Sequence, residues 1–139
     1  MILDVIIPGE PKAKARPRFS RRSGRAYTPA ATEQAEHSFQ SRSWVALREA
    51  GWTEPHKGPI SVEVMCVLGV PASWPKKKKA QALSGEVHPT SRPDVDNYAK
   101  LVMDALNGIA WVDDAQVVQL SVAKRYGEQP ETRLHLWGR

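Results

Sequence analysis

The stretch PDVDNYAKLVMDALNG, residues 93–108, decides the fold of this chain. Its apolar residues are spaced i, i+3, i+4, i+7 and i+8, which is the repeat of one helix face. They are Tyr98, Leu101, Val102, Ala105 and Leu106. Asn107-Gly108 is a typical helix stop. The pattern predicts a helix that follows Pro93 and buries one side.

Alternating apolar residues predict strands before and after this helix. The run from Ile60 to Leu68 is the strongest of them, and its last residues are apolar on both faces. The other strands are expected at Met1 to Pro8, at about Ala115 to Arg125, and at Thr132 to Trp137. The segment from Glu10 to Thr28 has no hydrophobic period and reads as a long basic loop or irregular edge segment.

Two further helices are expected from their end signals. One spans about 30 to 50, with Thr28-Pro29 as N-cap and first helical position. The other lies within Ser73 to Gly85, with Ser73 as a cap and Pro75 in its first turn. Four strands and two or three helices predict a small single α+β domain over residues 1–139, a mixed four-stranded sheet packed by the helices. The length of 139 residues suffices for one core and not for two ordinary ones.

The composition excludes several classes of protein. A hydrophobic content of 41% and a charged content of 25% disfavour disorder and fibrous repeats. The longest mostly apolar run, residues 59–72, is too short to span a membrane. The N-terminus lacks an export signal and Cys66 has no second cysteine to pair with, so we expect a soluble cytoplasmic protein with no membrane partner.

Positive charge is concentrated in two segments. Lys+Arg 20 against Asp+Glu 15 gives a net charge of +5, which suits a polyanionic partner. Residues 11–32 contain seven cations and no acid: Lys12, Lys14, Arg16, Arg18, Arg21, Arg22 and Arg25. A second segment adds Lys76, Lys77, Lys78 and Lys79. Both segments suit contacts with the phosphates of a polyanion such as DNA.

The acids gather elsewhere. Five of the 15 fall within 21 residues: Asp94, Asp96, Asp104, Asp113 and Asp114. If Pro93 and Val95 keep the chain extended, Asp94 and Asp96 project to one side as a pair that can hold a divalent ion. Lys100 would then lie one helical turn beyond Asp96. Asp113 and Asp114 come after the next turn, and the fold must bring them to the pair.

Such a set suits phosphodiester cleavage, which requires an activated water and stabilisation of charge on the phosphate. Hard divalent ions held by carboxylates provide both. Histidine is not needed, and His37, His56, His88 and His135 show no metal-ligand spacing. Lys100 could donate to the scissile phosphate.

Each fragment also has an ordinary structural interpretation. An aspartate before a helix is often a cap, and Asp113-Asp114 alone is typical of a turn. Asp104 reads as a solvated i+4 partner of Lys100, and Lys76 to Lys79 as a solvated helix face. The combination of acids with two basic segments in a small chain is what favours the functional interpretation.

The ordered set of motifs resembles the RusA family of Holliday junction resolvases. The residues that carry the resemblance are Asp94-Val95-Asp96-Asn97, Lys100, Leu101 to Gly108, Asp113 to Val117, Pro11 to Phe19, Tyr27-Thr28-Pro29, and Ser73 to Lys78. The similarity covers almost the whole chain, and its ordered set is specific although each fragment alone is weak.

The resemblance implies a RusA-like homodimeric endonuclease of bacteria and their prophages. It implies that the enzyme nicks four-way DNA junctions in DNA recombination and repair, with Mg²⁺ or alternatively Mn²⁺ as cofactor, and leaves 5′-phosphate products. By matching positions, Asp94, Asp96 and Asp114 are expected to be the catalytic metal-binding carboxylates and Lys100 the catalytic lysine. Asp113 remains the alternative ligand from the adjacent pair.

Two other functions remain open at this point. One is a non-catalytic protein that binds branched DNA, and the other is a metal-dependent nuclease that prefers flaps, forks or plain duplex. An assay of a synthetic junction with Mg²⁺ and with EDTA distinguishes the nuclease from a non-catalytic binder. A comparison of substrates at equal concentration distinguishes a junction nuclease from one that prefers flaps, forks or duplex.

Overall fold

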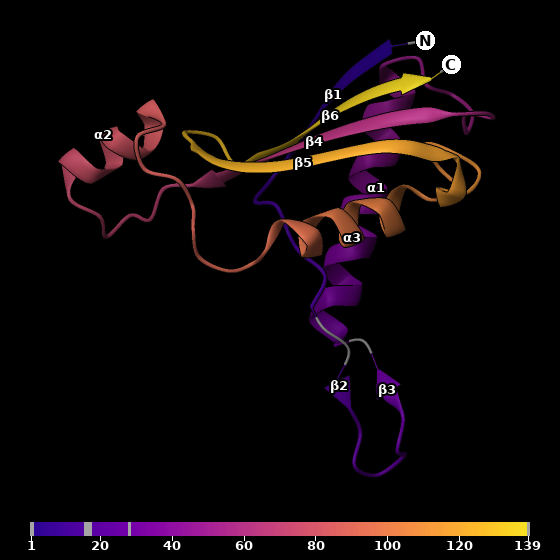
Figure 1. Cartoon of the computed structure of the whole chain (residues 1–139), viewed down its shortest axis with the longest axis horizontal. Coiled ribbons are helices and arrows are strands. Elements are labelled where there is room, and N and C mark those ends of the chain that lie inside the picture. The colour runs from indigo at the N-terminus through magenta and orange to yellow at the C-terminus, as the bar shows by residue number, and fades with distance from the viewer. Residues whose placement is uncertain (1, 16–17, 28, 139) are drawn as a thin grey trace.

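A computed structural model describes residues 2–15, 18–27 and 29–138. A four-stranded sheet has two helices against one face, and two basic appendages extend from this body (Figure 1). The described residues contain three α-helices, so the predicted mixed α+β fold is confirmed. No helix among them is long and apolar enough to cross a membrane.

The sheet has the order β1-β6-β4-β5. Its strands are β1 (Ile2–Pro8), β4 (Ile60–Gly69), β5 (Val117–Gly127) and β6 (Glu131–Gly138). β6 pairs antiparallel with both β1 and β4, whereas β4 and β5 are parallel. A parallel pair needs a long crossover, and the chain between β4 and β5 supplies it with α2 (Lys76–Ser84) and α3 (Val95–Leu106). The four predicted strands are confirmed.

The core lies between the sheet and two helices. The predicted apolar stripe of α3 is buried in full, from Tyr98 to Leu106. It packs with inward-facing residues such as Val62, Val64 and Leu134. α1 (Ala30–Glu49) adds Phe39 and Leu47 to the same cluster. Each such side chain stabilises the fold by roughly 1.5–3 kcal/mol, which fixes α3 firmly on the sheet.

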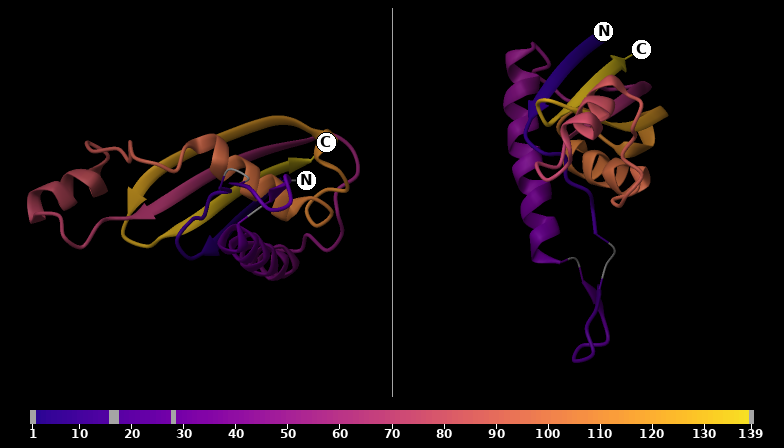
Figure 2. Two further views of the ribbon diagram at one scale, coloured as in Figure 1. Left: turned by 90° about the horizontal axis from the view of Figure 1, so that it is seen from below. Right: turned by 90° about the vertical axis from the view of Figure 1, so that its left-hand side faces the viewer.

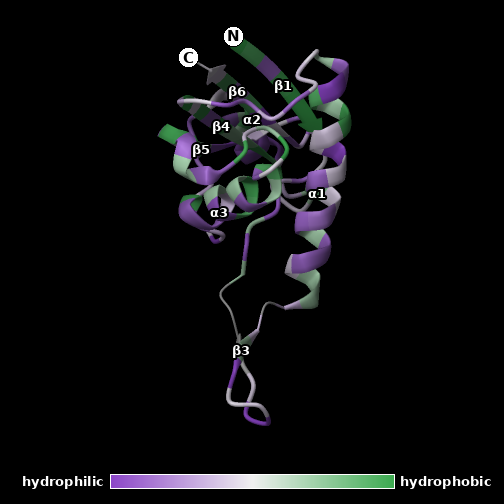
Figure 3. Cartoon of the chain, turned by 90° about the vertical axis from the view of Figure 1, so that its right-hand side faces the viewer, coloured by the Kyte–Doolittle hydropathy of each residue, from purple (hydrophilic) through white to green (hydrophobic). Residues whose placement is uncertain are grey.

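Two segments extend away from this body (Figure 2). The first is a hairpin arm, residues 18–27, built on the two-residue strands β2 (Arg18–Phe19) and β3 (Ala26–Tyr27). Its closing turn uses Gly24 at φ 65°, a left-handed conformation that favours glycine. The second is α2, at the far end of the sheet. Figure 3 shows that the tip of the arm is polar, so it has no apolar surface to bury.

Two helix starts differ from the expectation. Pro29 occupies the N-cap of α1 and is not its first helical residue. Thr28, the expected cap, lies outside the described residues. Pro75 likewise occupies the N-cap of α2 where Ser73 was expected. Both prolines keep an extended ψ, of 141° and 152°, and the helix begins one residue later.

Candidate functional site: the two ends of helix α3

Asp94 and Asp96 lie at the N-terminal end of α3. Asp94 is the N-cap residue, with φ −74° and ψ 155°, and Asp96 lies in the first turn. The expectation that residues 94–96 form one extended stretch is therefore wrong, because Val95 already begins the helix. The two aspartates still share one end of one element, two residues apart, and both side chains are exposed.

Although Asp94 occupies the N-cap position, its side chain does not cap the helix. In the described part of the chain, the Asp94 side chain makes no capping hydrogen bond. The first amides of the helix that find a partner, those of Asn97 and Tyr98, donate to the Asp94 backbone carbonyl at 3.1 and 3.3 Å. The carboxylates therefore remain available to a ligand, and the helix N-terminus beside them favours anionic groups such as phosphate.

Lys100 lies one turn beyond Asp96, and its side chain is exposed. Asp104, the expected partner of Lys100, instead pairs with Lys14, which also contacts Glu36 at 3.4 Å. The hydrogen bond to Asp104 raises the pKa of Lys14. Lys14 thus ties its segment to α1 and α3, and Lys100 makes no ion pair with any residue that the structure describes.

The opposite end of α3 holds the second acidic pair. After Asn107 the chain turns into a short 3₁₀ helix, η1 (Asp114–Gln116), and Asp113 is its N-cap. The Asp113 carboxylate accepts from the Ala115 amide at 3.4 Å, and the Gln116 side chain accepts from the Asp113 amide at 2.8 Å. Asp113 therefore acts in a capping box.

Asp114 is held differently from its neighbour. Its Oδ1 accepts a hydrogen bond from the buried Trp111 indole at 2.7 Å, and its amide donates to Asn107 Oδ1 at 3.1 Å. The contact leaves one carboxylate oxygen without a described protein donor. Each of the two adjacent aspartates thus accepts one hydrogen bond, and the 2.7 Å contact holds Asp114 more closely than the 3.4 Å contact holds Asp113.

Within one chain, the structure does not bring the two acidic pairs together. Twelve helical steps separate Val95 from Asn107, which is roughly 18 Å at about 1.5 Å per residue. Among residues 2–15, 18–27 and 29–138, no three His, Cys, Asp or Glu side chains are arranged to hold a metal ion. Asp94 and Asp96 lie at one end of the helix, and Asp114 follows its other end.

Six of the predicted DNA-binding residues are exposed on the two appendages. Arg21, Arg22 and Arg25 are exposed on the arm, and Lys76 to Lys78 are exposed on α2. Lys79 is half-buried in α2, and Lys12 is exposed at the start of the basic segment. Arg16 and the side chain of Arg18 lie outside the described residues. The positive groups of the arm and of α2 therefore lie on two separate projections (Figure 1).

α2 is anchored by aromatic contacts. Trp74 packs edge-on against Tyr126 of β5, with ring centroids 5.2 Å apart. The Lys78 ammonium lies 3.9 Å from the centroid of the Trp74 ring, a cation–π contact. These contacts fix the lysine-rich helix to the end of the sheet.

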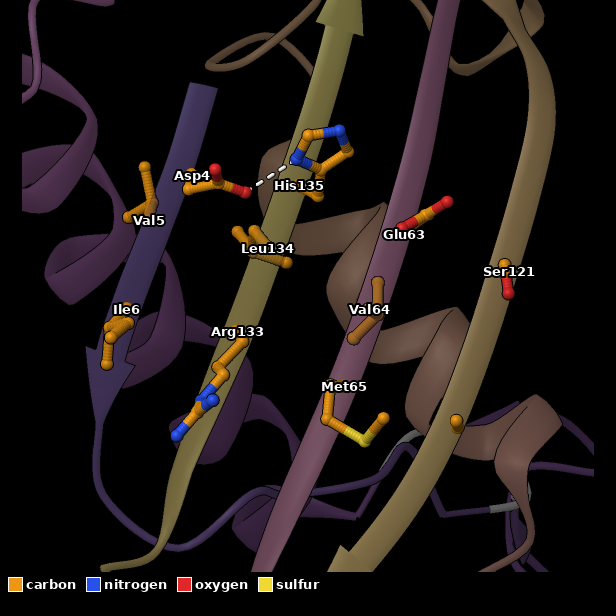
Figure 4. Close-up of a pocket in the computed structure, with 11 residues that line it drawn as sticks. Asp4, Val5, Ile6, Glu63, Val64, Met65, Ser121, Arg133, Leu134 and His135 are labelled. Carbon is orange, nitrogen blue, oxygen red and sulfur yellow. Dashed lines mark hydrogen bonds and ion pairs between the residues drawn. The ribbon is translucent and has the colours of Figure 1, made fainter. Parts of the chain in front are cut away.

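A second group of polar residues lies on the open face of the sheet (Figure 4). A shallow depression of about 410 Å³ there is lined by Asp4, Glu63, Ser121 and His135, among others. His135 Nδ1 lies 2.5 Å from Asp4 Oδ1. Since α3 covers the other face of the sheet, this group is separate from both acidic pairs.

Sequence reasoning missed the residues that position the acids. Trp111 and Asn107 hold Asp114, and Lys124 of β5 donates to two backbone carbonyls just before Asp94. One signal for Lys124 was available in the sequence. Alternate residues of β5 share one face of the sheet, and Lys124 follows Leu120 and Val122 on the face that the helices cover. A lysine at such a position needs a polar partner.

Comparison with known proteins identifies the chain's relatives. The family model described as "Endodeoxyribonuclease RusA" matches residues 8–136. The chain is also 40% identical over 131 residues to the uncharacterized protein YqaN of Bacillus subtilis (strain 168). That alignment covers 91% of this chain and 89% of YqaN.

Proposed function

The chain belongs to the RusA family of endodeoxyribonucleases, and from this membership we propose that it is a Mg²⁺-dependent enzyme that nicks four-way DNA junctions in recombination and repair. The observation that carries the proposal is the N-terminal end of α3. Two exposed carboxylates without capping hydrogen bonds stand there beside an exposed lysine. These are the groups that phosphodiester hydrolysis with a hard cation requires.

The donor chemistry fits Mg²⁺, with Mn²⁺ as an alternative. Mg²⁺ prefers oxygen ligands and is usually bound by one or two carboxylates together with substrate phosphates. Asp94, Asp96 and Asp114 would hold the ion. When bound, it supplies activation of water and neutralisation of phosphate charge.

The chain's own groups do the remaining work. Lys100 donates to a non-bridging oxygen of the scissile phosphate and stabilises the negative charge that develops there. Trp111 keeps the Asp114 carboxylate in place through its indole N–H. The products carry 5′-phosphate and 3′-hydroxyl ends.

A homodimer reconciles the separated acids. A two-fold axis across the middle of α3 would set two copies of the helix antiparallel, so that the N-terminal end of each faces the C-terminal end of the other. Asp94 and Asp96 of one protomer would then meet the partner subunit's Asp114. Exposed apolar side chains along α3, its following turn and β5 support this interface: Val95, Val112, Val118 and Leu120.

The two appendages would grip the DNA. Arg21, Arg22 and Arg25 on the arm and Lys76 to Lys78 on α2 contact backbone phosphates, which positions the DNA without reading its sequence. Selectivity for a branched substrate then comes from the spacing of these grips in the dimer.

A gel assay tests the proposal. A labelled four-way junction, a flap, a fork and a plain duplex of equal length are incubated at equal concentration with Mg²⁺ and with EDTA. We expect the junction to be nicked in Mg²⁺ but not in EDTA, and to be bound in both. Binding without cleavage at any Mg²⁺ or Mn²⁺ concentration would identify a non-catalytic junction binder. Faster cleavage of flaps or forks would show that these, and not four-way junctions, are the preferred substrate.

A further inference from the structure

Lys124 connects strand β5 to the segment that leads into the N-terminal end of α3. Its ammonium donates to the Ser91 carbonyl at 2.8 Å and to the Pro93 carbonyl at 2.9 Å. These carbonyls precede Asp94 by three residues and by one. The lysine therefore holds the chain immediately before the two exposed carboxylates.

Besides the packing of the buried Pro89, the segment has little else to hold it. Among the described residues, the only hydrogen bonds to residues 88–93 are the two from Lys124. The preceding backbone contacts end at Val87, which donates to Gln81, and the next begin at the Asp94 carbonyl. Pro89 and Pro93 lack amide hydrogens, so the segment has fewer donors of its own.

The surroundings of Lys124 explain why its ammonium points toward the Ser91 and Pro93 carbonyls. Lys124 lies opposite the buried Cys66 in the β4–β5 ladder, on the face that α3 covers. Burial raises the pKa of the Cys66 thiol to about 12, and the nearby Lys124 charge opposes that rise. With the buried Cys66 on one side, the ammonium has its polar partners in the carbonyls of residues 91 and 93.

We propose that Lys124 is a positioning residue of the nuclease site: by fixing the Ser91 and Pro93 carbonyls, it sets the direction in which Asp94 and Asp96 present their carboxylates. This inference rests on the proposed function. Lys124 touches neither DNA nor the ion, and it acts only through the backbone. Groups that orient metal ligands in this way typically contribute about 10- to 100-fold to metal affinity or activity.

The test compares Lys124→Met with wild type and with Arg125→Met. Methionine keeps most of the stem and removes the donors. Arg125 is the next residue along β5, is exposed, and lies on the open face, so its substitution removes the same charge without touching the segment. Lys124→Gln is a second variant, because its shorter side chain cannot span both carbonyls but remains polar.

The first readout is hydrogen exchange in the metal-free protein. The Asn97 and Tyr98 amides report on the first turn, because both donate to the Asp94 carbonyl. We expect about tenfold faster exchange of these amides in Lys124→Met, a smaller increase in Lys124→Gln, and no change in Arg125→Met. Unchanged exchange in both Lys124 variants would overturn the proposal.

The second readout is a Mg²⁺ titration of junction nicking. Lys124→Met should need about tenfold more Mg²⁺ for half-maximal nicking, whereas saturating Mg²⁺ restores most of kcat and junction binding in EDTA stays unchanged. Loss of kcat without a change in Mg²⁺ dependence would contradict the positioning role. If wild type nicks no DNA, the proposed function fails and the exchange measurement still decides whether Lys124 holds the turn.

Discussion

Aspartates lie at both ends of α3, but only those at the C-terminal end are held by hydrogen bonds to their side chains. At the N-terminal end, Asp94 and Asp96 are exposed and make no described side-chain hydrogen bond to the protein. At the C-terminal end, Asp113 closes a capping box, and Asp114 is held by Trp111 and positioned beside Asn107. One end offers carboxylates to a ligand, and the other presents a carboxylate that the fold has already oriented.

In the proposed dimer, this contrast would divide two roles within one site. An oriented carboxylate loses little freedom when it binds an ion, whereas exposed carboxylates can adjust to the ion and the phosphate together. Since α3 keeps its two ends apart within one chain, the proposed site requires a second chain that brings the opposite ends together.

The largest effect is expected at the exposed end. Asp96→Asn should reduce Mg²⁺-dependent junction nicking by about 10³-fold, equivalent to about 4 kcal/mol, because the amide is a poor ligand for a hard cation. Junction binding in EDTA should persist, since the positive grips lie elsewhere. Asp104→Asn is the matched control: it lies on the same helix but pairs with Lys14, and it should keep most activity. Equal losses of nicking in both variants would contradict the assignment of Asp96 as a metal ligand.

Lys100→Ala should follow, with about a 10²-fold fall in kcat and little change in junction affinity, because the lysine acts on charge that develops during the reaction. Single-turnover kinetics at saturating enzyme measure this split. Lys57→Ala, an exposed lysine in the loop before β4, controls for loss of charge. A loss of affinity alone would place Lys100 in the DNA grip.

The arm should contribute to binding and not to chemistry. Replacing Arg21, Arg22 and Arg25 by Ala should make the log–log salt dependence of junction affinity less steep by about 2.7 for each protomer whose arm grips the junction, since each phosphate contact contributes about 0.9. Single-turnover nicking of the bound junction should change little. An unchanged salt slope, measured by titration at several salt concentrations, would show that the arm does not touch phosphate.

The smallest effect concerns the oriented end. Trp111→Phe removes the donor to Asp114 and should lower nicking about tenfold, with a loss of about 2 kcal/mol in the free energy of unfolding. Trp52→Phe is the matched control, because its buried indole donates to a backbone carbonyl, that of Ala110, at 2.9 Å. If both variants lose stability and nicking equally, the indole of Trp111 has no special role in holding Asp114.

The sequence predicted the elements well because their signals are local. The stripe of α3 and the alternation of β4 depend on neighbouring residues, and both were confirmed within one or two positions. Helix starts were less accurate, since proline suits both the cap and the first turn, and Pro29 and Pro75 each took the cap.

The site was harder to predict because it depends on contacts between distant residues. Lys14 pairs with Asp104 across 90 positions, and Lys124 reaches carbonyls 31 and 33 positions earlier. Sequence spacing placed Asp94 near Asp96 but could not show that the length of α3 keeps Asp114 away from both.

Mixed dimers test the central claim most directly. Differently tagged Asp96→Asn and Asp114→Asn protomers are coexpressed, and dimers that carry both tags are purified and assayed for nicking of one labelled strand. If the site joins two protomers, each mixed dimer keeps one intact site and about half of wild-type nicking. A dimer of wild type with the Asp96→Asn, Asp114→Asn double variant should then be inactive. An inactive first dimer and a half-active second one would contradict the account, because the site would lie within one chain.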